Sequence, residues 1–225
     1  MSKLEKSKGI KALEDYDYNT AIGYFNKSLS YNDRDTEVLT YLGTAYALKS
    51  FHEDYYKDTY ENQALANYQK SLNIDSNKAF TYSSIGRYYE IIKKELNKAI
   101  YYYEKALTKD SKYPILNKLG NLYFKLNDFK KSIYYYKKDI VLEKTTNTLF
   151  ELGRTYFQIS NYDSALVFFN EVKKSDPNYE NIYYHLAMTY LNLNQKSNSV
   201  SNFQIAARLG NEAAKEWLKT NNYSW

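Results

Sequence analysis

Residues 119–136 read LGNLYFKLNDFKKSIYYY and contain two short elements that recur along the chain. In the first element, a Leu-Gly pair is followed after two residues by Tyr123. In the second, the small residue Ser132 is followed four positions later by the aromatic residue Tyr136. Apolar residues three and four positions apart lie on one face of an α-helix. The stretch therefore predicts two short helices joined by a turn.

Both elements recur at a nearly constant step. The glycines of the first element are 34, 43, 34 and 33 residues apart, at Gly9, Gly43, Gly86, Gly120 and Gly153, and a further 34 residues lead to Ala187. The second element recurs as Ala21 and Phe25, Ala64 and Tyr68, Ala99 and Tyr103, Ser132 and Tyr136, Ala165 and Phe169, and Ser199 and Phe203. A small residue lets the two helices cross closely, and the aromatic side chain fills the space beside the crossing. One such hairpin cannot bury its own apolar face, so the hairpins must stack on one another.

The spacing predicts six helical hairpins and one closing helix. We expect the first helices over 3–14, 35–49, 79–92, 113–126, 146–159 and 180–193, and the second helices over 18–31, 61–74, 96–109, 129–142, 162–174 and 196–208. Gly210 is expected as a helix C-cap and Asn211 as the N-cap of a final helix over 211–220. That helix is expected to cover the open apolar face of the last hairpin.

The recurring elements, together with the Asp176-Pro177 pair that closes one hairpin, resemble the tetratricopeptide repeat family. The resemblance covers about residues 2–210 and implies an all-α fold, a right-handed α-solenoid of antiparallel hairpins. We expect one superhelical domain over 1–225, with repeats at about 2–34, 36–77, 79–112, 113–145, 146–179 and 180–210 and a capping helix at 211–221. The family serves many partners, so the resemblance by itself names none.

Members of this family commonly bind partners in a concave groove lined by the first helices. The resemblance therefore implies a protein or peptide partner, and we expect its contacts one position after the glycine and about one turn to either side. These positions hold Arg87, Asn117, Asn121, Phe124, Phe150, Arg154, Phe157, Tyr184 and Met188. Arginine recognises carboxylates, asparagine pairs with peptide groups and aromatic side chains hold apolar anchors. We therefore expect an extended segment with acidic and apolar residues. The carboxylate clamp of some family members is not matched, because Ile10 and Tyr41 stand where it needs asparagine.

The sequence disfavours catalysis. It contains no cysteine and only two histidines, His52 and His185, which are far apart in the chain. It has neither a glycine-rich phosphate loop nor the GxSxG pattern of a hydrolase. We therefore expect no enzymatic activity, no metal and no cofactor, and we expect His185 on the surface of its helix.

The charge and the hydropathy pattern bear on location and on other partners. A net charge of +5, spread over interleaved charges, gives little affinity for phosphates, so RNA binding is the less favoured alternative. Self-association through tyrosine-rich faces or through the ends of the array is a second alternative. No run of 18 apolar residues is present, so we expect no membrane span. The polar start of the chain predicts a cytoplasmic location, with a removed signal peptide left open.

Three irregular features keep more than one interpretation. The second repeat has extra residues around 51–60, which either extend both helices by a turn or project as a functional edge. Asp139 stands where other repeats have Ser, Ala or Val, and we expect a Lys, Arg or Tyr side chain to pair with it. The runs 101–103 and 134–136 are each three consecutive tyrosines, which cannot all face inward on a helix.

Overall fold

The structure is a computed structural model that describes residues 1–179 and 181–225. These residues form thirteen α-helices and one short 3-10 helix, and none of them lies in a β-strand. The expected all-α helical repeat fold is thereby confirmed. The contacts divide the chain into two compact units, Met1–Ile115 and Leu116–Trp225, called unit 1 and unit 2 below. Each unit is described by itself, and a single domain over the whole chain stays a prediction.

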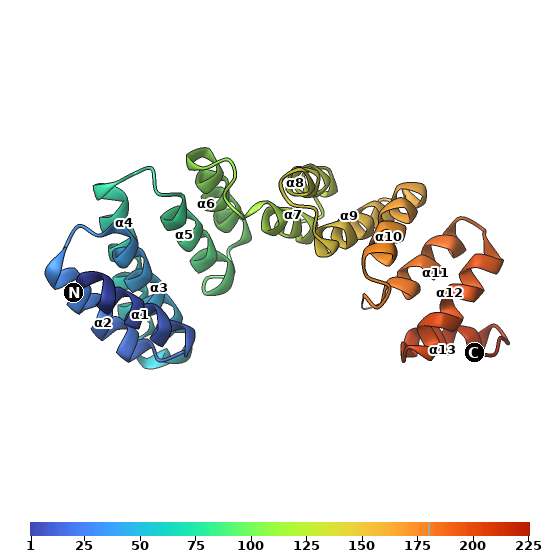
Figure 1. Ribbon diagram of the computed structural model, residues 1–225, viewed down its shortest axis with the longest axis horizontal. Helices are drawn as coiled ribbons and strands as arrows, with labels where there is room; N and C mark the ends of the chain where they lie inside the picture. Colours follow the sequence, from blue (N-terminus) through green and yellow to red (C-terminus); the bar gives the residue numbers. More distant parts are fainter. Residues whose placement is uncertain (180) are drawn as a thin grey trace. The chain divides into compact units, whose positions relative to one another are not determined.

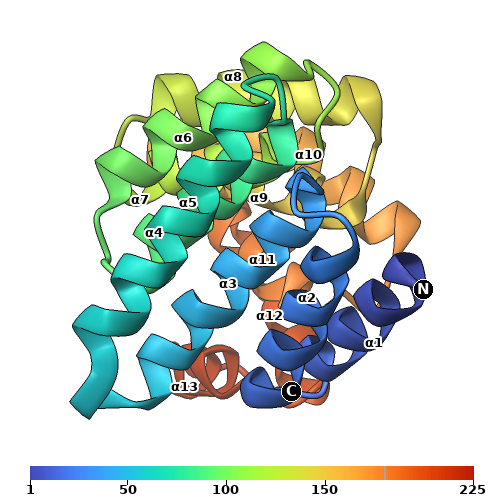
Figure 2. The same ribbon diagram turned by 90° about the vertical axis from the view of Figure 1, so that its left-hand side faces the viewer.

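Unit 1 is a stack of three antiparallel helical hairpins (Figures 1 and 2). Its helices are α1 Ser2–Glu14, α2 Tyr18–Tyr31, α3 Thr36–His52, α4 Lys57–Ile74, α5 Ala79–Ile91 and α6 Leu96–Lys109, and the 3-10 helix η1 spans Asp54–Tyr56. Within each hairpin the two helices pack on each other, and contacts of α2 with α3 and of α3 and α4 with α5 join the hairpins.

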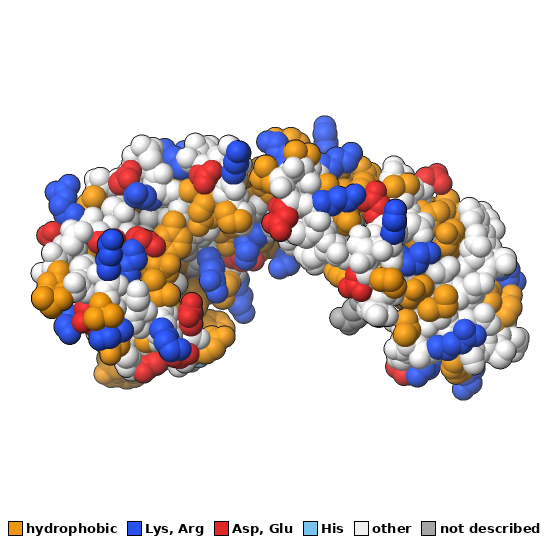
Figure 3. All heavy atoms as spheres, in the orientation of Figure 1, with side chains coloured by type: hydrophobic (Ala, Val, Ile, Leu, Met, Phe, Trp, Pro, Cys, Tyr) orange, Lys and Arg blue, Asp and Glu red, His pale blue; other side chains and the backbone are white. Residues whose placement is uncertain are grey.

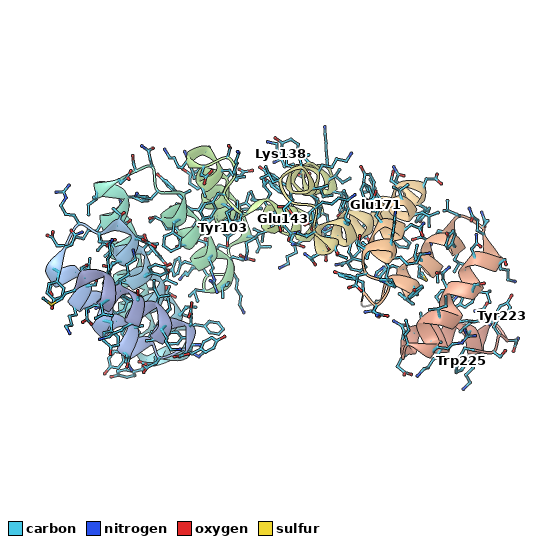
Figure 4. The ribbon with its side chains drawn as sticks, in the orientation of Figure 1. Tyr103, Lys138, Glu143, Glu171, Tyr223 and Trp225 are labelled. Atoms are coloured by element: carbon cyan, nitrogen blue, oxygen red, sulfur yellow. The ribbon has the colours of Figure 1, made fainter. Side chains whose placement is uncertain are left out.

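Unit 2 continues the same pattern with three hairpins and a closing helix. Its helices are α7 Leu116–Lys125, α8 Phe129–Leu142, α9 Thr146–Gln158, α10 Tyr162–Ser175, α11 Ile182–Asn192, α12 Lys196–Arg208 and α13 Glu212–Thr220. In α13, Ala214 and Leu218 are fully buried, and the Trp217 ring stacks on Phe203 with 4.1 Å between the ring centroids. Tyr223 and Trp225 follow α13 at the end of the chain (Figure 4). The last hairpin is thus covered as its sequence predicts.

Glycine stands where the two helices of a hairpin come closest. A Cβ atom built on Gly43 would lie 2.7 Å from the Tyr68 ring and 3.0 Å from the carbonyl oxygen of Ala64. Tyr68 is buried, and its hydroxyl lies 3.2 Å from Thr44 Oγ1. The same closeness to a buried ring recurs at Gly9, Gly86, Gly120 and Gly153. The expected role of the small residue at the helix crossing is therefore confirmed.

Short polar side chains cap the helices. Asp35 Oδ1 accepts hydrogen bonds from the backbone N–H groups of Glu37 and Val38, each at 3.1 Å. Asp17, Asp128, Asn161 and Asn211 cap α2, α8, α10 and α13 in the same way. After α12, Gly210 adopts a φ of +95°, as the expected C-cap requires. These caps satisfy backbone groups that a helix leaves unpaired at its ends.

Helix boundaries differ from the expected ones by three residues or more in two places, at the start of the fourth hairpin and within the second hairpin. The first helix of the fourth hairpin, α7, begins at Leu116 rather than at residue 113, because Pro114 disfavours helical backbone at Tyr113. The extra residues of the second repeat lengthen α3 to 17 residues and α4 to 18, with η1 between them. The interpretation that both helices run a turn longer is therefore correct. The expected start of a helix at residue 180 lies outside the described residues.

Tyrosine triplets place one ring inward and one outward. Tyr103 and Tyr136 are buried, whereas Tyr101 and Tyr134 are each about half exposed, as the helical period requires. The middle ring of each triplet stacks on a tyrosine of the first helix of its hairpin, and the Tyr89 and Tyr102 centroids are 5.3 Å apart. Most of the tyrosine-rich character therefore serves packing within the hairpins.

Candidate functional site

The first helices of unit 2 carry eight of the nine residues expected to contact a partner. Seven of them are partly exposed: Asn117, Asn121 and Phe124 on α7, Arg154 and Phe157 on α9, and Tyr184 and Met188 on α11. Phe150, the eighth, is 9 % exposed and belongs to the core. The ninth, Arg87, is exposed on α5 of unit 1.

Arg154 is held in place by a carboxylate and two rings. Its Nη1 donates hydrogen bonds to both carboxylate oxygens of Glu151, at 3.1 and 2.9 Å. The guanidinium carbon lies 5.2 Å from the ring centroid of Phe124 and 6.0 Å from that of Phe150. Both hydrogen bonds use Nη1, which leaves the Nη2 and Nε edge available within the part of the chain that the structure describes. The site therefore offers a fixed hydrogen-bond donor beside apolar surface.

The two asparagines are engaged with neighbouring side chains. Asn121 Oδ1 accepts a hydrogen bond from the Tyr136 hydroxyl at 2.9 Å, and Asn121 Nδ2 donates to Asn117 Oδ1 at 2.9 Å. Asn117 Nδ2 in turn donates to Thr148 Oγ1 at 2.8 Å. Asn121 Nδ2 also donates to the backbone carbonyl oxygen of Asn117 at 3.1 Å, so both of its N–H groups are used, whereas Asn117 keeps one unused amide N–H. The pair is thus oriented by the fold, and Asn117 retains a donor for a peptide group.

Asp139 ends this chain of hydrogen bonds. Thr148 Oγ1 donates to Asp139 Oδ2 at 2.6 Å. The expectation that a Lys, Arg or Tyr side chain pairs with Asp139 was therefore wrong. The partner is a threonine because Thr148 lies in the first turn of α9, opposite Asp139. Unit 1 has a counterpart, in which Thr40, Ser71 and Thr81 hydroxyls contact one another at 2.7–3.2 Å.

His185 is partly exposed but packed among aromatic rings, so it is not the open helix-surface residue that the sequence predicts. Its ring centroid lies 4.9 Å from that of Phe150 and 5.4 Å from that of Phe169. Burial, and secondarily the charge of Arg154, lower the pKa of His185 to about 4. The imidazole beneath the site is therefore neutral near pH 7. His185 lies two residues before the small residue Ala187. The residue at the same position of the second repeat, Tyr41, contacts Phe25 of the preceding hairpin, so this position faces the preceding hairpin.

Arg87 differs from Arg154 in its surroundings. Both arginines follow the glycine of their repeat. Three residues before Arg154 stands Glu151, whereas three residues before Arg87 stands Ser84, which carries no charge. No ion pair is formed by Arg87 within the described residues. The guanidinium of Arg87 is therefore the less compensated positive charge of the two.

The residues that the structure describes form neither a metal-binding cluster nor a membrane-spanning helix. No group of three or more His, Asp or Glu side chains is arranged to hold a metal ion. No helix combines the length and the apolar character needed to cross a bilayer.

The family model of the tetratricopeptide repeat matches residues 113–138, 146–179 and 180–209. These three segments coincide with the three hairpins of unit 2. These three hairpins are tetratricopeptide repeats. No curated protein matches its sequence.

Solved structures share the fold of this chain at low identity. YrrB, a tetratricopeptide protein described as having an unusual peptide-binding site, is 23 % identical with a TM-score of 0.70, and the match covers 87 % of this chain and 97 % of YrrB. PilF of Pseudomonas aeruginosa is 14 % identical with a TM-score of 0.72, covering 98 % and 97 %. The C-terminal part of a repeat protein from Cytophaga hutchinsonii is 16 % identical with a TM-score of 0.75, covering 96 % and 87 %. At these identities the likeness establishes the fold.

Sequence reasoning about the tetratricopeptide repeats missed the residues that position the site. Glu151 orients Arg154, and its spacing of three residues on a helix was a usable signal. Thr148 links the asparagines to Asp139, but that contact joins two hairpins and has no short-range signature.

Proposed function

We propose that this chain is a protein-interaction scaffold that binds an extended peptide or protein segment along α7, α9 and α11. Tetratricopeptide repeats serve protein–protein interaction in general. The finer proposal, a segment with acidic and apolar residues, is supported chiefly by the arrangement around Arg154. A guanidinium fixed between Phe124 and Phe150 presents a donor edge next to an apolar surface.

Neighbouring side chains extend the surface in both directions along the first helices. Phe157 and Tyr162 rings are in edge contact at 5.3 Å, and Phe157 is partly exposed. Met188 and Tyr184 pack beside the cluster of the last hairpin and are also partly exposed. Such half-buried aromatic and sulfur-containing side chains adapt to an apolar anchor of a ligand. Asn117 supplies a polar contact for the ligand backbone, and Asn121 holds Asn117 in place.

The test begins by selecting binding peptides from a displayed library against the whole chain. The affinity of one selected peptide, labelled with a fluorophore, is then measured by anisotropy. We expect Phe124→Ala and Arg154→Gln each to weaken binding about tenfold, since truncation of a central anchor costs more than 1 kcal/mol. Arg208→Gln is the matched control, because Arg208 is an exposed arginine on the second helix α12.

Unchanged affinity in both groove variants, with their folding verified by circular dichroism, would refute this placement. If the selected ligands instead bind with a steep loss of affinity on adding salt, an electrostatic partner such as RNA would replace the peptide. Elution of the chain alone at twice its mass in size-exclusion chromatography would support the self-association alternative.

A further inference from the structure

The extended second hairpin exposes aromatic side chains at one end of unit 1. Tyr55 is 89 % exposed, Tyr16 78 %, Phe51 54 % and Tyr56 52 %. These rings come from the α1–α2 turn, the last turn of α3 and η1. Figure 2 shows the turn between α3 and α4 (cyan) at the lower left edge of the ribbon, and Figure 3 shows hydrophobic side chains (orange) along the lower edge of unit 1. A group of exposed apolar side chains of this kind marks an interaction surface.

Contacts between the rings fix their orientation. Tyr18 and His52 stack with 5.4 Å between centroids, and the Tyr18 hydroxyl lies 3.3 Å from His52 Nε2. Phe51 meets His52 edge-on at 5.4 Å, and Tyr55 meets Tyr56 edge-on at 4.7 Å. The α1–α2 turn and the extra turn of α3 are thereby joined. The patch therefore exists only because the second repeat is longer than the others.

A recess of about 390 Å³ opens within this patch. It is lined by Tyr16, Asp17, Tyr18, Asn19, His52 and Glu53. The lining contains the carboxylates of Asp17 and Glu53, of which Glu53 already pairs with Lys49. Hydrogen bonding from Thr20 lowers the pKa of Asp17, which keeps that carboxylate charged. Asp17 forms no ion pair within the described residues, so its charge is open to a partner.

A cation of the chain itself already occupies similar surroundings next to the recess. The Lys49 ammonium lies 4.5 Å from the centroid of the Tyr60 ring and 3.7 Å from Glu53 Oε1. It also donates a hydrogen bond to Asn19 Oδ1. This end of unit 1 thus surrounds a positive charge with a tyrosine face, a carboxylate and an amide oxygen. The recess offers a second tyrosine and a second carboxylate in Tyr16 and Asp17, while Asn19 is already engaged by Lys49.

We propose that the recess binds a lysine or arginine side chain from a basic segment of a partner protein. The cation would lie against the tyrosine faces while its charge is balanced by Asp17. A purely apolar partner would bury the Asp17 carboxylate without compensation, and an acidic partner would be repelled by it. This surface belongs to unit 1 and shares no residue with the proposed peptide site of unit 2.

The test uses the two histidines of the chain as reporters in NMR. The probe is a capped peptide of four Arg-Ser pairs, and the charge control is a capped peptide of four Glu-Ser pairs. We expect the basic peptide to shift the ring signals of His52, which lies in the recess, and to leave those of His185 in unit 2 unchanged. The acidic peptide is expected to shift neither.

Two variants separate binding from folding. Asp17→Asn removes the charge but keeps an N-cap of equal quality. Tyr16→Asn removes the ring at a residue with φ of 62°, where asparagine is better tolerated than tyrosine. We expect each variant to weaken binding of the basic peptide two- to fivefold, which is roughly the contribution of one exposed cation–π contact. Tyr134→Ala, at a comparably exposed tyrosine on α8, is the matched control and should bind like the wild type.

The proposal is overturned if both recess variants bind the basic peptide as tightly as the wild type. Equal binding of the acidic peptide, or equal shifts of both histidines, would overturn it as well. These results do not depend on the selected peptide of unit 2, so the two proposals fail or succeed separately.

Discussion

Replacing Gly43 by alanine tests the close helix crossing on which the repeat depends. The added Cβ would lie 2.7 Å and 2.8 Å from two atoms of the Tyr68 ring and 3.0 Å from the carbonyl oxygen of Ala64. The ring cannot move away freely, because Tyr68 is 1 % exposed and its hydroxyl contacts Thr44. The carbonyl belongs to the backbone of α4, so the helix itself must shift. Both neighbours therefore resist the extra methyl group.

Two opposing effects set the magnitude. Overpacking a well-filled core by one methyl group costs about 1–3 kcal/mol, and the involvement of backbone places this site in the upper part of that range. Alanine in place of glycine within a helix contributes about 1 kcal/mol of stability. The net expected loss in the free energy of unfolding is therefore about 2 kcal/mol. Gly23 in α2 is the matched control, because a Cβ there would meet nothing within 4 Å. Gly23→Ala should gain about 1 kcal/mol.

Thermal unfolding followed by circular dichroism at the helix band measures both changes. At about 2–4 °C per kcal/mol, the midpoint should fall by about 4–8 °C for Gly43→Ala and rise by about 2–4 °C for Gly23→Ala. Urea unfolding at fixed temperature provides the free energies. If Gly43→Ala were as stable as Gly23→Ala, the helices would not cross as closely as the structure shows, and the explanation of the repeated glycine would be wrong.

Two further predictions concern the interior of unit 2. The ring of His185 should titrate in NMR near its pKa of about 4. Because this pKa lies below that of an unfolded histidine, the unfolded chain binds the proton more tightly than the folded chain. The free energy of unfolding should therefore fall by up to about 3 kcal/mol as the pH drops from about 6.5 to about 4. His185→Phe should reduce that loss, and a wild-type midpoint near 6.5 would contradict the burial. Thr148→Val should lower the free energy of unfolding by about 1–3 kcal/mol because it removes the hydrogen-bond donor to Asp139. Adding Asp139→Val should recover part of this loss. Additive losses in urea unfolding would show that the two side chains are not coupled.

The fold could be predicted from the sequence because its signals are local and repeated. The step between glycines predicted the hairpins, and the second helices α2, α6, α8 and α12 have the expected bounds. The start of α7 was missed because the repeat pattern outweighed the effect of Pro114. Asn211 was recognisable as a cap because short-range chemistry determines a helix start.

The site could be predicted only in part. The repeat period places Phe124, Arg154 and Met188 on first helices, and these side chains are partly exposed there. Whether an exposed side chain is already engaged depends on contacts between hairpins, which periodicity does not contain. Asn117 is an example, since its amide donates to Thr148 in the following hairpin. His185 is another, since only the stacking of α11 on the preceding hairpin buries its ring.

The junctions between hairpins show why the repeats of this chain are not interchangeable. At three junctions, one residue of the second helix and one residue near the start of the next first helix match in character. Ser71 lies 3.0 Å from Thr81 and Asp139 accepts from Thr148, whereas Val172 and Ile182 belong to one apolar cluster.

Exchanging the partners of two junctions would bury a hydroxyl or a carboxylate against an aliphatic side chain, at a cost of about 1–3 kcal/mol for each unpaired group. The matched pairs thus favour one order of hairpins over any other. In a chain of similar repeats, this complementarity keeps each first helix, and the surface that it presents to a partner, in its place along the array.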